Sequence, residues 1–206
     1  MPIDITWLGH ASIMIKTKNT VVYIDPWKID PASQKADIIL LTHDHYDHYC
    51  PDDISLVSTD ATRIIAPMST QIVTDMIKPG ESLEIDDVMV KALPAYNVDK
   101  DFHPKAKGWV GYVVNTLGKT IYHTGDTDFI PEMKGLVVDV ALMPVGGTYT
   151  MTADDAGDAL KTMQAGHVIP IHFGDIVGSS KDAHRLSEIS TADVHVLRPG
   201  ESFTLD

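Results

Sequence analysis

Three histidines and two aspartates occupy one short segment of the chain. The segment reads His43, Asp44, His45, Tyr46, Asp47, His48 and follows the apolar run 38–41. A short apolar run predicts a buried strand, so the polar cluster is expected where a strand ends and a loop begins. Imidazole nitrogens and carboxylate oxygens are ligands that divalent transition metals prefer. The segment therefore predicts a metal site at the edge of a sheet, with a solvated polar loop as the alternative.

Other acidic or imidazole residues stand at the ends of predicted strands elsewhere in the chain. They are Asp25, His103, Asp126 and His172. Ligands that are remote in sequence can converge on one rim of a sheet when each follows a strand. The sequence has no Gly-x-Ser-x-Gly motif, so nothing predicts a serine nucleophile of that kind.

The elements that must position these residues are a mixture of strands and helices. Strands are expected over 3–8, 12–17, 21–25, 36–42, 83–85, 88–93, 109–116, 119–123, 137–143, 167–171, 194–197 and 203–205, and helices over 52–58, 69–78, 152–163 and 181–189. This order favours two packed sheets with helices outside over one doubly wound parallel sheet. At 206 residues and without a visible linker, a single domain over 1–206 is expected.

The composition excludes several classes of protein. The 16 basic and 29 acidic residues give a net charge of −13, which argues against a nucleic-acid groove. The single cysteine, Cys50, excludes an intrachain disulfide and is compatible with a reducing compartment. No secretory signal and no run of about 20 apolar residues is visible. We expect a cytoplasmic protein with no membrane insertion and a small-molecule substrate; homo-oligomerisation is left open.

The order of these motifs resembles that of the metallo-β-lactamase superfamily. The motifs occur in the same order along the chain as in that family: the HxHxDH segment 43–48, then the Gly-Asp pair 125–126, then the strand-end His172. The segments 7–12, 122–127 and 143–151 are similar to those of small stand-alone metal-dependent hydrolases around the ascorbate-6-phosphate lactonases. The resemblance spans most of the chain. It implies a four-layer αββα sandwich of class α/β (α+β), with two mixed sheets and helices on the outer faces.

The resemblance implies that His43 and His45 bind a first metal ion. The spacing fits, because residues two apart in an extended segment point the same way. The third histidine departs from the family pattern, in which it follows closely on a strand ending in Pro-Ala. Here the segment 94–95 has that pair, and the nearest following histidine is His103. We expect His103 to be this third ligand; its alternative is a histidine on a surface loop. His123 is the other candidate for the third ligand, but it is expected to point inward or to support a ligand.

The resemblance implies that Asp47 and His48 bind a second metal ion, which His172 completes. Asp126 would bridge the two ions, because a carboxylate has two oxygens. Two divalent cations are therefore implied, zinc first and manganese, iron or nickel as alternatives. Asp25 resembles the family's aspartate that accepts the other N–H of a ligand histidine. Its alternative is a plain Asp-Pro turn.

The remaining imidazoles and the thiol carry weaker expectations. His10 and Asp175 are candidates for supporting a ligand. The other histidines are expected on the surface or packed against strands, and Cys50 is not assigned as a ligand. These histidines are His167, His184 and His195.

The implied activity is hydrolysis of an ester, lactone or phosphodiester by a metal-bridging hydroxide. Asp47 would orient the hydroxide and relay its proton. The alternatives are a redox di-iron protein and a non-catalytic metal-binding protein of the same fold; the irregular third histidine keeps the latter open. Specificity is expected from the loops 97–108 and 146–151, and Lys105, Lys107 and Arg63 could contact an anionic group.

Overall fold

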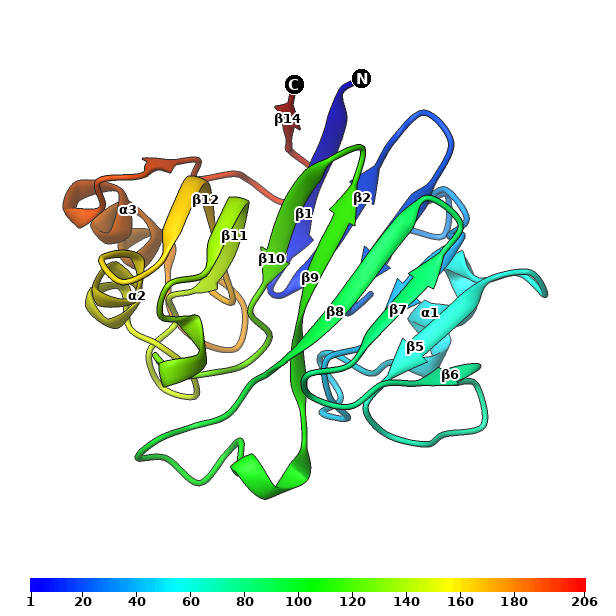
Figure 1. The fold of residues 1–206 in the computed structure, drawn as a ribbon, viewed down its shortest axis with the longest axis horizontal. Helices are drawn as coiled ribbons and strands as arrows, with labels where there is room; N and C mark the ends of the chain where they lie inside the picture. The colour runs from blue at the N-terminus through cyan, green and yellow to red at the C-terminus, as the bar shows by residue number, and fades with distance from the viewer. The chain divides into compact units, whose positions relative to one another are not determined.

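The computed structural model describes all residues from 1 to 206, which form two units with one mixed sheet each. The first unit comprises residues 1–77 and 197–206, and the second comprises residues 78–196. Figure 1 traces the chain through the labelled elements of both units.

The first sheet has the strand order β14-β1-β2-β3-β4-β5-β6. The elements of this unit are β1 (Ile3–Gly9), β2 (Ser12–Lys16), β3 (Val21–Ile24), β4 (Ile38–Leu40), α1 (Pro51–Val57), β5 (Arg63–Ala66), β6 (Asp75–Met76) and β14 (Ser202–Leu205). β4 is buried along its whole length and pairs in parallel with β3 and β5. An apolar run with no alternation is typical of such an interior parallel strand. The cluster 43–48 thus follows the carboxyl end of an interior strand, where α/β proteins place their chemistry.

The helix expected over 69–78 is wrong. The segment instead runs alongside β5, and β6 pairs with it in parallel at Ile65 and Asp75. The hydroxyl of Thr74 exchanges hydrogen bonds with the backbone of Ile64. The segment 70–74 is rich in β-branched residues, which favour extended backbone. The apolar spacing is compatible with a helix, but the segment pairs with the edge of β5 instead. The strand β5 was not predicted from the sequence.

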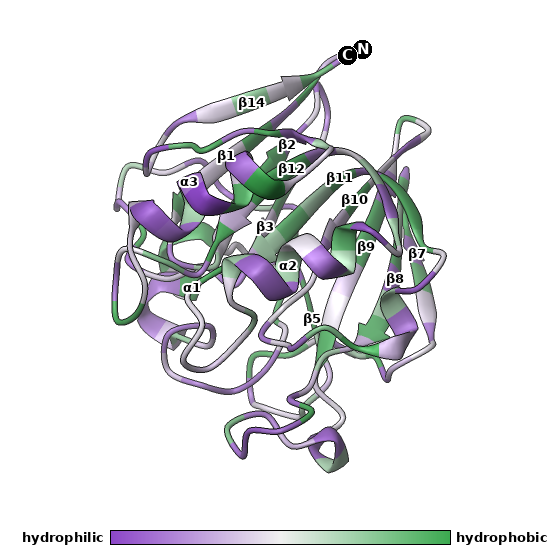
Figure 2. Ribbon diagram, turned by 90° about the vertical axis from the view of Figure 1, so that its left-hand side faces the viewer, coloured by the Kyte–Doolittle hydropathy of each residue, from purple (hydrophilic) through white to green (hydrophobic).

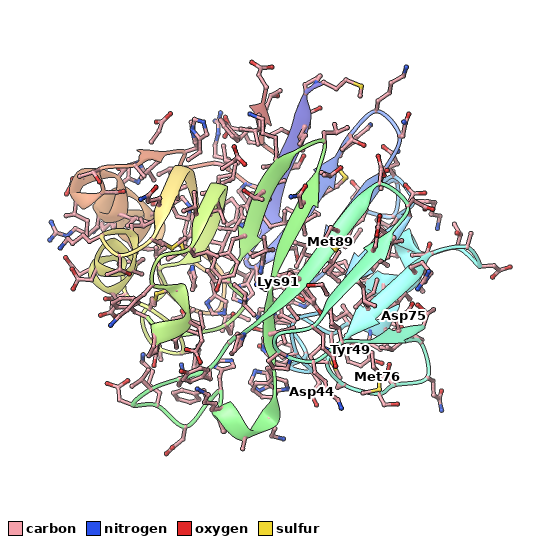
Figure 3. All side chains as sticks on the ribbon, in the orientation of Figure 1. Asp44, Tyr49, Asp75, Met76, Met89 and Lys91 are labelled. Atoms are coloured by element: carbon pink, nitrogen blue, oxygen red, sulfur yellow. The ribbon has the colours of Figure 1, made fainter.

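The second sheet has the strand order β13-β12-β11-β10-β9-β8-β7. Its strands are β7 (Ser82–Ile85), β8 (Val88–Pro94), β9 (Val110–Thr116), β10 (Lys119–His123), β11 (Val137–Pro144), β12 (Gln164–Ile171) and β13 (Asp193–Val194). Pairing is antiparallel from β7 to β10 and parallel from β10 to β13. On β8 the exposed Met89 and Lys91 (Figure 3) alternate with the buried Val88 and Val90. This period of two marks a strand with one face in the core.

Two helices accompany the parallel half of the second sheet. α2 (Ala153–Leu160) and α3 (Ser180–Ile189) lie side by side next to β11 and β12 (Figure 1). In Figure 2 their visible faces are mostly hydrophilic, whereas β10 and β11 are hydrophobic. Both helices begin with a capping box, formed by Thr152 with Asp155 and by Ser179 with Asp182. The expected cap at Thr152 is confirmed, although α2 ends at Leu160 rather than at 163.

The α/β class with two mixed sheets and accompanying helices is confirmed. The four-layer packing and the single domain over 1–206 stay predictions. None of the helices is long and apolar enough to cross a membrane.

Candidate metal centre

The first unit brings the histidines of the 43–48 segment into ring contact. His43 Nε2 lies 3.1 Å from His45 Nδ1. Two ligands of a tetrahedral zinc ion, each about 2.0–2.1 Å from it, are about 3.3 Å apart. The two nitrogens therefore have nearly the separation that one shared metal ion requires. His43 is buried and His45 is partly buried, so solvent reaches the pair from the side of His45.

Asp25 fixes the orientation of His48 directly and that of His43 through Thr42. Its carboxylate accepts the backbone N–H of Thr42 at 2.8 Å, the hydroxyl of Thr42 at 2.6 Å and Nδ1 of His48 at 2.7 Å. Because the Thr42 hydroxyl donates to Asp25, its oxygen can accept from His43 Nδ1, which lies 2.9 Å away. Both rings therefore carry the proton on Nδ1, and both offer the Nε2 lone pair to a ligand. The expected contact between Asp25 and a ligand histidine is present.

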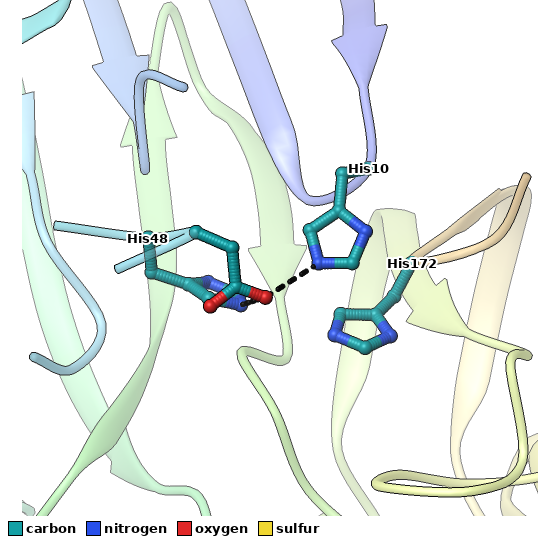
Figure 4. A group of neighbouring side chains, drawn as sticks. His10, His48 and His172 are labelled. Atoms are coloured by element: carbon teal, nitrogen blue, oxygen red, sulfur yellow. Dashed lines mark hydrogen bonds and ion pairs between the residues drawn. The ribbon is translucent and has the colours of Figure 1, made fainter. Parts of the chain in front are cut away.

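Asp47 lies beside two imidazoles of the same unit. Its Oδ2 is 3.0 Å from His10 Nε2, the contact drawn dashed in Figure 4, and 3.8 Å from His48 Nε2. His10 and His48 meet edge to face, with ring centroids 5.6 Å apart. From the sequence, His10 is only a weak candidate for a supporting role, yet its ring holds the carboxylate in place.

The second unit gathers its three expected ligands around one oxygen atom. Asp126 Oδ2 is 2.9 Å from His172 Nε2 and 3.3 Å from His103 Nε2. All three side chains are buried. One carboxylate oxygen facing two imidazole nitrogens suits a bridging carboxylate with a histidine on each side. Thus the donor chemistry and separations in each unit fit transition-metal ligands.

His103, the least regular of the expected ligands, is oriented by Asn97. The amide oxygen of Asn97 accepts both the backbone N–H of His103 at 2.9 Å and its Nδ1 at 3.1 Å. That contact leaves Nε2 directed at Asp126. The competitor His123 is buried, and its Nδ1 accepts the N–H of Gly125 at 3.1 Å. His123 thus points inward, one of the two expectations for it, and supports the turn before Asp126. Asn97 was missed, although its position two residues after the Pro-Ala pair 94–95 was a usable signal.

Three of these residues have left-handed backbone. The φ angles are 50° at His10, 48° at Asp25 and 57° at His172. Such values are uncommon for residues other than glycine, although aspartate and histidine adopt them more readily than most. Strained backbone of this kind clusters at functional sites. Gly146 makes room for His172, because a Cβ on that glycine would lie 2.4 Å from the His172 carbonyl oxygen.

Two of the basic residues expected to contact an anion are already paired. Arg63 donates two hydrogen bonds to Asp75, at 2.8 and 2.6 Å. Lys105 donates to Tyr96 and to Glu132. The expectation that Arg63 and Lys105 would contact an anion is therefore not supported by this structure.

Cys50 and Asp175 take no part in the two sets of donors that the contacts above define. Burial raises the pKa of the Cys50 thiol, so the thiolate that metals bind is disfavoured at neutral pH. Asp175 stands in a tight turn, where its carbonyl accepts the N–H of Val177 at 2.7 Å. Its expected supporting role stays a prediction.

Comparisons with known proteins agree with the fold and show the family. Residues 4–172 match the model of the beta-lactamase superfamily domain. A UPF0173 metal-dependent hydrolase of Thermoplasma volcanium is 32% identical, over 93% of this chain and 93% of the relative. One from Bacillus pumilus is 30% identical, over 97% of this chain and 99% of the relative. The crystal structure of a protein from Parabacteroides distasonis, described as a metal-dependent hydrolase, superposes with a TM-score of 0.84 at 32% identity, covering 97% of this chain and 94% of that one.

Proposed function

The chain belongs to the β-lactamase superfamily, among the metal-dependent hydrolases named UPF0173, and we propose that it hydrolyses an ester, lactone or phosphodiester bond of a small molecule. One observation carries the proposal: Asp126 Oδ2 meets both His103 Nε2 and His172 Nε2. A buried carboxylate oxygen between two imidazoles suits a shared metal ligand better than a structural hydrogen bond, which needs only one donor.

We assign metal binding to two sets of donors: the residues of the segment 43–48 in the first unit, and Asp126 with its two histidines in the second. The proposed ligands are His43, His45, Asp47, His48, His103, Asp126 and His172. The facing nitrogens of His43 and His45 support a first ion. The Nε2 atom of His48 supports a second, because the bond of Nδ1 to Asp25 keeps the proton on Nδ1. Nitrogen and oxygen donors without sulfur suit zinc, with manganese, iron or nickel as the other choices.

A bound divalent ion of this kind lowers the pKa of its water toward neutrality and polarises the substrate oxygen. The protein's own groups then hold and move the proton. Asp47 is the proposed proton acceptor, because its carboxylate is the one beside His48 that is still partly open to solvent. His10 donates its Nε2–H to Oδ2 of that carboxylate, at 3.0 Å, and keeps it in place. Asp25 stays an acceptor throughout, since all its hydrogen bonds come from buried donors.

The substrate is proposed to contact two loops of the second unit. The side-chain amide of Asn97 donates to the carbonyl of Tyr149 at 2.9 Å, which joins the loops 97–108 and 146–151. Phe102 and Tyr149 meet edge to face with ring centroids 4.8 Å apart, and Phe102 remains exposed. The exposed Phe102 ring, on the loop that also carries His103, can pack against an apolar part of a small substrate with Tyr149 behind it.

The test pairs metal analysis with turnover. The full chain is reconstituted with zinc, manganese, iron or nickel and assayed on lactones, phosphodiesters, esters and thioesters. His48→Ala and Asp126→Ala are compared with His184→Ala, an exposed histidine on α3 outside both sets. We expect the first two variants to lose metal and nearly all turnover, and the control to keep both.

The outcomes separate the competing functions. Unchanged metal content and hydrolysis in His48→Ala and Asp126→Ala would overturn the proposal. Iron with a visible absorption band and no hydrolysis would favour a redox di-iron protein. Bound metal with no turnover on any substrate class would favour a non-catalytic metal-binding protein.

A further inference from the structure

Another group of side chains that could bind a metal lies in the second unit, near the middle of β12 and away from the carboxyl end that His172 follows. It consists of His167, Asp193 and His195. His167 stands within β12, five residues before His172, which is about 16 Å along a strand. The group is therefore separate from the donors around Asp126, and it does not depend on the proposed function.

The parallel pairing of β12 and β13 brings the three residues to one place. His167 is directly opposite Asp193 in the register of the two strands. His195 follows Asp193 by two residues, so its side chain returns to the same side of the extended segment. The backbone N–H of His195 donates to the carbonyl of Val168 at 2.8 Å, which holds it in that position.

The ligand atoms form a nearly equilateral triangle. His167 Nδ1 is 3.1 Å from His195 Nε2 and 3.3 Å from Asp193 Oδ2, and the third side, from His195 Nε2 to Asp193 Oδ2, is 3.4 Å. The edges of a tetrahedron around zinc, with ligands about 2.0–2.1 Å away, are about 3.3–3.4 Å. The three atoms thus have the spacing of three corners of a zinc tetrahedron.

A bound cation explains the three short separations better than hydrogen bonds between the side chains do. A single proton joins two of the three atoms, whereas one cation accepts a lone pair from each of them. Burial, reinforced by the neighbouring His167, lowers the pKa of His195 against the opposing effect of Asp193, so the ring is neutral at neutral pH. A neutral imidazole is the form that binds metal.

The group is open enough for an ion to reach it. The side chains of His167, His195 and Asp193 are 33%, 24% and 64% exposed. We propose that His167, Asp193 and His195 form a surface zinc site whose fourth ligand is water. Because β13 has only two residues, an ion there would clamp this edge strand to β12.

The test is a zinc titration of the full chain, followed residue by residue. ¹⁵N-labelled protein is titrated with Zn²⁺ alone, and the imidazole resonances of His167 and His195 are recorded together with the zinc bound per chain after dialysis. We expect both rings to shift together, and His195→Ala to bind one zinc fewer than the wild type with unchanged hydrolysis. His184→Ala is the matched control and should bind as much zinc as the wild type. Asp126→Ala, which tests the proposed function, should leave these shifts intact.

Two results would overturn the inference. One is an equal zinc content in His195→Ala and the wild type. The other is an equal loss in His184→Ala, which would mean that surface histidines bind zinc without a defined site. If His195→Ala does not fold by circular dichroism, Asp193→Asn replaces it, because that side chain is the most exposed of the three.

Discussion

Asp25→Asn is the sharpest test of how the first unit prepares its histidines. The carboxylate of Asp25 accepts three hydrogen bonds, two from Thr42 and one from His48, and all of these groups are buried. Asparagine has the same shape but only one accepting oxygen. Its NH₂ group must therefore face a donor, whichever way the amide is turned.

The two orientations of the amide have different consequences. If the NH₂ group faces the backbone N–H of Thr42, that donor has no means of adjusting and stays unsatisfied. If it faces His48, the ring must move its proton from Nδ1 to Nε2 in order to accept. The proton then occupies the lone pair that would bind metal. In either case one charge-assisted hydrogen bond is lost, which contributes about 1.5–3 kcal/mol to stability.

We expect Asp25→Asn to lower the free energy of unfolding by about that amount and to weaken metal binding by about 10- to 100-fold, the usual range for a group that orients a ligand histidine. Zinc content is measured after dialysis at fixed free zinc, stability by urea denaturation, and the tautomer of His48 by ¹⁵N NMR of the ring. Asp139→Asn is the control, because Asp139 likewise accepts the N–H and the hydroxyl of a threonine but lies away from both donor sets. Unchanged zinc affinity with the proton still on Nδ1 of His48 would refute the reasoning.

Three further predictions concern other parts of the chain. Asn97→Ala removes the acceptor of His103 Nδ1 and should weaken metal binding by about 10- to 100-fold with little loss of fold, measured by the same zinc dialysis. Gly111→Ala places a Cβ 2.4 Å from the carbonyl oxygen of Thr124 and should lower the free energy of unfolding by about 1–3 kcal/mol or more, measured by urea denaturation. Hydrogen bonds from its arginine and threonine partners lower the pKa of Asp75, so its stabilisation is present above the ordinary aspartate value of about 3.9 and is lost as the pH falls through the lower folded-state pKa. Asp75→Asn should therefore be less stable than the wild type by about 0.2–1 kcal/mol at neutral pH, and the difference should shrink in acid.

Each of these predictions has a result that contradicts it. Wild-type zinc affinity in Asn97→Ala would mean that the His103 ring is held by other contacts. Gly118→Ala, where an added Cβ meets no atom within 4 Å, is the comparison for Gly111→Ala; an equal loss in both would remove the steric argument. For Asp75→Asn, the contradicting observation is a stability difference that stays constant with pH.

The donor residues could be predicted because their types and their strand-end positions are local properties of the sequence. The run before His43 is apolar throughout, and the interior strand β4 follows from it directly. The partners of those donors could not be predicted in the same way. That Asn97 holds His103, and that His10 holds Asp47, depends on loops whose course is decided by tertiary contacts.

The incorrect prediction of a helix over 69–78 has a similar origin. The segment 69–78 has helical apolar spacing, yet it forms an edge strand because β5 offers a row of unpaired backbone groups. The group His167, Asp193 and His195 depends on the register of a two-residue strand, and no sequence pattern encodes it.

At His10, Asp25 and His172, the left-handed backbone lowers stability, whereas the side chains are needed for the candidate metal centre. A left-handed residue with a side chain costs about 1–2 kcal/mol relative to the right-handed form, and glycine avoids that cost. At these positions the backbone alone would favour glycine, whereas the contacts to Asp47, His48 and Asp126 require the side chains that are present. Glycine at His10 or His172 should therefore cost less stability than the loss of a buried imidazole alone would, because the relieved backbone strain offsets part of that loss, while metal binding and turnover should be lost with the side chain. The backbone strain at His10 and Asp25 is offset by apolar burial in the first unit, to which the fully buried strands β3 and β4 contribute.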